Sequence, residues 1–83
     1  MTNQEIAVEI VKLALNITNV IEENVSIIYR EEIAHLKHYG RSCNIPLDIY
    51  YDKYQDNFFA HYAESFAQTH NITKVIELFR SMK

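Results

Sequence analysis

The sequence predicts an all-α protein, a helical hairpin or a three- to four-helix bundle, and three observations favour this fold class. The 83-residue chain contains one glycine and one proline, although tight turns between strands depend on such residues. Apolar residues recur at steps of three and four in the first half of the chain. A second series with the same spacing contains five of the ten aromatic residues. We therefore expect one helical domain over residues 1–83, with helices at about 3–39, 46–70 and 74–82.

The first helix is expected to begin at Thr2 and Glu5, whose spacing matches a capping box. The apolar residues behind this box form one face of a long helix, and this face rotates farther along the chain. Two interpretations stay open: one unbroken helix, or two helices separated by a break near 19–25. Gly40 then ends the segment, because glycine is common directly after a helical C-terminus. The apolar face consists of Ile6, Ile10, Leu13, Ile17 and Val20.

The second helix is expected to begin at Pro46, whose missing N–H needs no partner in a first helical turn. It should end near Asn71, which tolerates the left-handed cap conformation. Thr73 would then cap a short third helix. The apolar side of this last helix consists of Val75, Ile76, Phe79 and Met82.

The lengths of the two long helices predict a homodimer. A helix over 3–39 would be about 55 Å long, and one over 46–70 would be about 37 Å long. The shorter helix cannot cover the whole apolar face of the longer one. Either the first segment breaks and folds back, or a second copy of the chain covers the excess.

The charge and the cysteine content exclude several classes. Eight basic and eleven acidic residues give a net charge of −3, which argues against a general nucleic-acid binder. Cys43 is the only cysteine, so an internal disulfide is excluded and a cytoplasmic location is expected. No basic segment precedes an apolar run at the N-terminus, and no uncharged apolar stretch reaches about 18 residues. We expect neither a secretory signal nor a membrane span.

His35 and His38, with Cys43 nearby, are the best candidate metal ligands in the sequence. Structural zinc sites usually contain two paired ligand motifs, whereas this chain has one pair and a lone thiol, with His61 farther along. Glu32 and His35 match the Glu-x-x-His pattern of di-metal bundles only once. We expect no metal, no cofactor and no enzymatic activity, and whether His35, His38 and Cys43 bind a metal stays open.

The aromatic segment between residues 50 and 66 provides the candidate partner-binding surface. Tyr50 and Phe59 lie off the main apolar stripe of the predicted helix, and exposed aromatic side chains are common in binding surfaces. Aspartates at steps of four would form an acidic stripe that steers binding to a basic surface. The predicted partner-binding residues are Asp48, Tyr50, Asp52, Asp56, Phe59 and His61.

These observations predict a non-enzymatic protein-binding module that inhibits or neutralises a partner protein. The composition is similar in style to that of small, acidic, glycine-poor helical proteins of phages and mobile elements. This resemblance implies an inhibitor, immunity or regulatory protein. The alternative is a dimeric transcriptional regulator that binds DNA, although the last predicted helix offers only Lys74 and Arg80 as cations.

Overall fold

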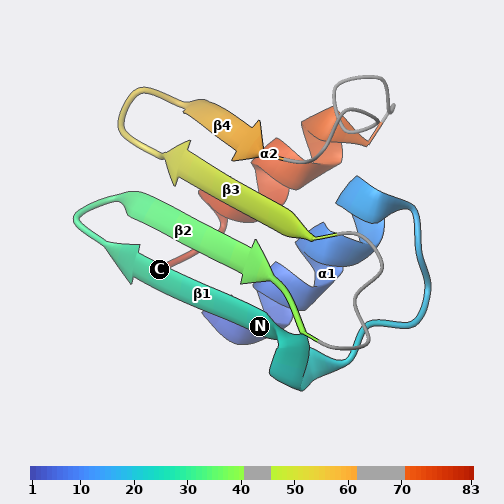
Figure 1. Ribbon diagram of the computed structural model, residues 1–83. Coiled ribbons are helices and arrows are strands. Elements are labelled where there is room, and N and C mark those ends of the chain that lie inside the picture. Colours follow the sequence, from blue (N-terminus) through green and yellow to red (C-terminus); the bar gives the residue numbers. More distant parts are fainter. Residues whose placement is uncertain (41–45, 62–70) are drawn as a thin grey trace.

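The computed structural model describes residues 1–40, 46–61 and 71–83, and its fold is mixed α/β, so the predicted all-α bundle is wrong. Helix α1 (Asn3–Leu15) precedes a four-stranded antiparallel sheet, and helix α2 (Ile72–Arg80) follows it. Both helices pack on one face of the sheet (Figure 1). After the short 3-10 helix η1 (Glu22–Asn24), the strands in spatial order are β1 (Val25–Arg30), β2 (Ile33–His38), β3 (Leu47–Asp52) and β4 (Asn57–His61).

Helix α1 begins where the sequence predicts and ends much earlier. The Thr2 hydroxyl accepts the N–H of Glu5, and the Glu5 carboxylate accepts the N–H of Thr2, so the capping box is confirmed. Asn16 adopts the left-handed conformation, with φ 54°, and ends the helix. Both interpretations of the segment 3–39, unbroken or broken near 19–25, are therefore wrong. The buried side of α1 consists of Ile6, Ala7, Ile10, Val11, Ala14 and Leu15.

Strands β1 and β2 occupy the second half of the predicted first helix. Glu31 and Glu32 connect them, with φ values of 53° and 67°. Two consecutive residues with positive φ are the signature of a tight hairpin turn that normally uses Asn and Gly. The scarcity of glycine is therefore a misleading signal in this chain, because two glutamates form the turn.

Strands β3 and β4, with the turn that joins them, span 47–61 of the predicted helix at 46–70, and residues 62–70 lie outside the part that the structure describes. The carboxylate of Asp52 accepts the N–H groups of Tyr54 and Gln55 at 2.9 and 3.2 Å. Side-chain bonds of this kind stabilise a turn without glycine or proline. Asp56 closes the turn with φ 56°.

Gly40 and Pro46 border strands and not helices. Gly40 follows β2 with φ 141°, and a Cβ atom there would lie 2.6 Å from Oδ1 of Asn24. Glycine is favoured at this position because other residues rarely adopt φ 141°, and a Cβ atom would also require the Asn24 side chain to move. Pro46 precedes the first residue of β3. The prediction that these two residues separate two helices is therefore wrong.

The hydrophobic core lies between the helices and the inner face of the sheet. Tyr51 of β3 is fully buried, and its ring stacks on Phe79 of α2 with ring centroids 4.8 Å apart. This contact fixes α2 against the middle of the sheet. The core residues from the strands are Val25, Ala34, Leu36, Leu47, Ile49 and Tyr51, and the C-terminal segment adds Val75, Phe79 and Met82.

The predicted short C-terminal helix is confirmed, with Asn71 in place of Thr73 before its first residue. The side-chain amide of Asn71 donates to the carbonyl of Leu13 at 3.1 Å, which joins the start of α2 to the end of α1. At the other end, Asn3 and Lys83 exchange two hydrogen bonds of 3.1 and 3.2 Å. The two helices therefore run antiparallel.

Candidate functional site

The face of the sheet turned away from the helices, here called the outer face, carries three rows of residues paired in register. Successive side chains of a strand point to opposite faces, so the residues between core positions belong to this face. The central row consists of Ile28, His35, Tyr50 and Phe59. The two flanking rows consist of Ser26, Lys37 and Asp48, and of Arg30, Ile33, Asp52 and Asn57.

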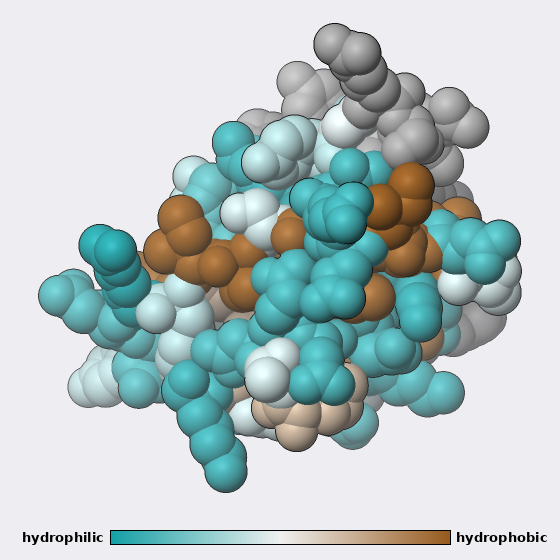
Figure 2. Space-filling model, turned by 90° about the horizontal axis from the view of Figure 1, so that it is seen from below, coloured by the Kyte–Doolittle hydropathy of each residue, from teal (hydrophilic) through white to brown (hydrophobic). Residues whose placement is uncertain are grey.

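Large apolar side chains of the outer face are exposed to solvent. The exposed fraction is 53% for Ile28, 47% for Ile33, 45% for Tyr50 and 59% for Phe59. Figure 2 views the molecule from below, past the β1 edge of the sheet, and shows that hydrophobic residues also reach the surface in patches on that side. An apolar centre with a polar rim is the usual anatomy of a protein–protein interface.

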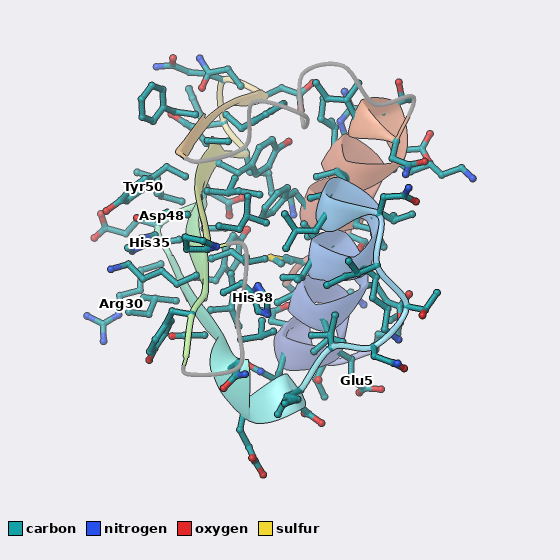
Figure 3. The ribbon with its side chains drawn as sticks, turned by 45° about the vertical axis from the view of Figure 1, so that its right-hand side comes forward. Glu5, Arg30, His35, His38, Asp48 and Tyr50 are labelled. Carbon is teal, nitrogen blue, oxygen red and sulfur yellow. The ribbon has the colours of Figure 1, made fainter. Side chains whose placement is uncertain are left out.

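His35, Asp48 and Tyr50 form an ordered cluster at the centre of the outer face. All three side chains project from the sheet away from the helices (Figure 3). Nε2 of His35 lies 2.7 Å from Oδ1 of Asp48. The His35 ring stacks on the Tyr50 ring, with centroids 4.0 Å apart and an angle of 12° between the planes. These contacts hold Tyr50 in one orientation, which lowers the entropy that it would lose on binding.

The cluster contains one half of a catalytic arrangement. A carboxylate that orients an imidazole is the supporting pair of an acid–base site. The hollow beside Tyr50, however, is lined mainly by aliphatic, aromatic and amide side chains, including those of Ile33, Asn57 and Phe59. Asp48 itself lines a second hollow, together with Ser26, Lys37 and Tyr39.

The structure brings together most of the predicted partner-binding residues, for a reason other than the predicted one. Asp48, Tyr50 and Asp52 alternate with core residues along β3, and Phe59 of β4 is paired in register with Tyr50. His61 is paired in register with Asp48. Asp48 and Asp52 do share the outer face, because residues of a strand share a face at steps of two. Asp56 lies in the turn before β4, so the predicted acidic stripe of three aspartates does not form.

Asp56, the remaining predicted residue, belongs to a separate cluster beneath the β3–β4 turn. Its carboxylate accepts hydrogen bonds from the Tyr51 hydroxyl and from the Arg80 guanidinium of α2. The Arg80 guanidinium, with the Tyr51 hydroxyl, lowers the pKa of Asp56 to about 2. Burial, together with the Asp56 carboxylate, raises the pKa of Tyr51 to about 12. The cluster ties the turn to α2 and thus has a structural role.

Three outer-face residues are not predicted from the sequence, namely Ile28, Ile33 and His35. The sequence offers one strand signal beside them, because Leu47, Ile49 and Tyr51 alternate with Asp48, Tyr50 and Asp52, which is a period of two and not of 3.6. Residues 25–30 and 33–38 have apolar side chains on both faces, so they lack this alternation.

The two candidate metal ligands, His35 and His38, lie on opposite faces of β2. His35 belongs to the outer face, whereas His38 is buried on the inner face with 6% exposure. Cys43 lies outside the described residues. Within residues 1–40, 46–61 and 71–83, no group of three His, Cys, Asp or Glu side chains could hold a metal ion.

Comparisons of the chain with protein-family models, with curated proteins and with solved structures gave no match. The function must therefore be inferred from the geometry of the outer face. Among the helices that the structure describes, none has the length and apolar character needed to cross a membrane.

Proposed function

We propose that this chain is a small, non-enzymatic protein-binding module that inhibits or neutralises a partner protein through the outer face of its sheet. The single observation that supports this most is the row of exposed residues Ile28, Tyr50 and Phe59, centred on the ordered stack of His35 and Tyr50. Aromatic anchors in the middle of an interface usually contribute most of the binding energy.

The binding mode is contact between a flat sheet and a partner surface. The predicted aromatic helix does not form over the described residues 46–61, because β3 and β4 occupy most of them. Tyr50 and Phe59 would instead be buried at the centre, and the charged rows would remain at the rim. The single cysteine is consistent with a reducing compartment, so we place this activity in the cytoplasm.

The alternative, a DNA-binding dimer, loses its main support. It depended on a long first helix as the dimerisation element, and α1 ends at Leu15. The described side chains of the outer face include two cations, Arg30 and Lys37, and two carboxylates, Asp48 and Asp52. This balance gives little attraction for phosphates.

A capture experiment with three immobilised proteins tests the proposal: the wild type, the double variant Tyr50→Ala/Phe59→Ala, and Tyr54→Ala. Tyr54 is 88% exposed but lies in the β3–β4 turn, away from the central row. It therefore controls for the loss of any exposed tyrosine. We expect the wild type and Tyr54→Ala to capture the same partner from lysate, and the double variant to lose it.

Equal capture by all three proteins, with circular dichroism showing the same fold, would contradict the placement of the interface. Capture lost in Tyr54→Ala and kept in the double variant would place it at the β3–β4 turn. Inhibition is then tested directly by adding the wild type to the captured partner and measuring that partner's own activity.

A further inference from the structure

The outer face divides into two halves of opposite charge. Its β1–β2 half carries Arg30 and Lys37, and its β3 strand carries Asp48 and Asp52. The central row also differs between the two halves: Ile28 lies at its β1 end and Phe59 at its β4 end. A surface with complementary halves is suited to a second copy of itself, because a two-fold axis brings each half against the other.

The register of the rows identifies the two-fold axis that gives this match. Sheets that pack face to face lie about 10 Å apart with their strands within about 30° of each other. An axis parallel to the strands puts β2 of each copy over β3 of the other and keeps the rows aligned. Lys37 then faces Asp48, His35 faces Tyr50, and Ile28 faces Phe59.

The other simple arrangement is unfavourable. A two-fold axis that lies between the sheets and runs across the strands puts each strand over its own copy. Each flanking row then faces the other flanking row of the second copy. Asp48 of one copy would then face Asp52 of the other, and Lys37 would face Ile33. Like charges directly opposite each other destabilise an interface.

We propose that a second copy of this chain occupies the outer face, giving a symmetric two-sheet sandwich in which Lys37 of each copy pairs with Asp48 of the other. The inference rests on the proposed function, since both use the same face, and it adds that the free protein covers this face by self-association. Partner capture then competes with dimer formation.

The size of the face sets the expected strength of the dimer. Four strands about 4.8 Å apart, with residues spaced about 3.4 Å, give a footprint of about 19 by 19 Å. This is about half of the roughly 800 Å² per partner in a stable interface of standard size. We therefore expect a micromolar dimer that exchanges readily, which is compatible with displacement by a partner.

Sedimentation equilibrium with charge-reversal variants tests the proposal. The variants Lys37→Asp and Asp48→Lys each put two like-charge contacts into the symmetric dimer. Each should weaken self-association by at least about tenfold. An equimolar mixture of the two variants should dimerise again, because every contact between the two different chains is then between opposite charges.

Lys37 and Asp48 are also paired in register within one sheet, so each variant carries a like-charge pair in its own fold. Circular dichroism of each variant alone therefore checks that it is folded before the mixture is measured. Restored association in the mixture supports the proposed dimer. A wild type that is monomeric at high micromolar concentration, or a mixture that stays as weakly associated as each variant alone, overturns it. If the protein dimerises but captures no partner, the proposed function is contradicted and the dimer is not. If the protein is monomeric but captures a partner, the dimer is contradicted and the proposed function is not.

Discussion

The inner and outer faces of this sheet come from the same strands but differ in burial and in the partners of their aromatic rings. On β2, Leu36 is fully buried under the helices, whereas Ile33 is 47% exposed on the other side. On β3, the ring of Tyr51 stacks against α2, whereas the neighbouring ring of Tyr50 stacks against His35 and faces solvent. Neighbouring residues thus belong to two different environments.

This difference separates folding from recognition. Burial of the inner residues supplies the hydrophobic free energy that stabilises the fold. The outer residues gain little from folding, so their apolar surface stays available for another protein. Substitutions on the two faces should accordingly affect different measurements.

The largest expected effect is a difference in the free energy of unfolding between substitutions on the two faces of β2. Leu36→Ala removes a fully buried side chain and should lower the free energy of unfolding by about 2–5 kcal/mol. Ile33→Ala on the outer face should lower it by only about 0.5 kcal/mol. Urea denaturation of both variants measures the difference. Equal losses would mean that the outer face is buried in the folded protein.

A smaller effect is expected at the turn between β1 and β2, which belongs to neither face. The double variant Glu31→Asn/Glu32→Gly suits the positive φ values of this turn and should stabilise the fold by about 0.5–1 kcal/mol. The melting temperature should rise by about 2–8 °C. The control Glu31→Gln/Glu32→Gln removes the same charges but leaves the backbone unfavourable, so a similar gain from it would attribute the effect to charge.

The smallest expected effect is the loss of stability at acid pH that follows from protonation of Asp56. The Asp56 carboxyl, held by Arg80, has a pKa of about 2 in the fold, below its ordinary value of 3.8. A lowered pKa stabilises the folded state above about pH 4, and this contribution is lost as the pH falls to about 2. Thermal melts of the wild type should therefore show a declining melting temperature over this range. The decline should be smaller in Asp56→Asn and in Arg80→Gln, and an unchanged decline in both would show that other carboxyls cause it.

The parts of the fold that can be predicted from the sequence depend on local signals. The capping box of Thr2 and Glu5 involves four consecutive residues, and it forms as predicted. The C-terminal helix has three apolar residues, Val75, Phe79 and Met82, that are buried together. Interactions within one or two helical turns identify both helices without reference to the rest of the chain.

The sheet could not be predicted in the same way, because its turns use unusual residues. Glutamates at 31 and 32 and the carboxylate of Asp52 take the places that glycine, asparagine and proline usually hold. Apolar residues on both faces of a strand also produce spacings of three and four by coincidence. Tyr51 and Tyr54 are three residues apart, yet the first is a core residue and the second lies in an exposed turn.

The pair of hydrogen bonds between Asn3 and Lys83 determines how the protein can be attached to a support. Asn3 is the first residue of α1, and Lys83 follows the end of α2, so the two ends of the chain lie close together beside the helices. A tether at either end of the chain therefore leaves the molecule in nearly the same orientation on a sensor surface. The outer face then points into the solution, and binding curves from the two attachments should agree.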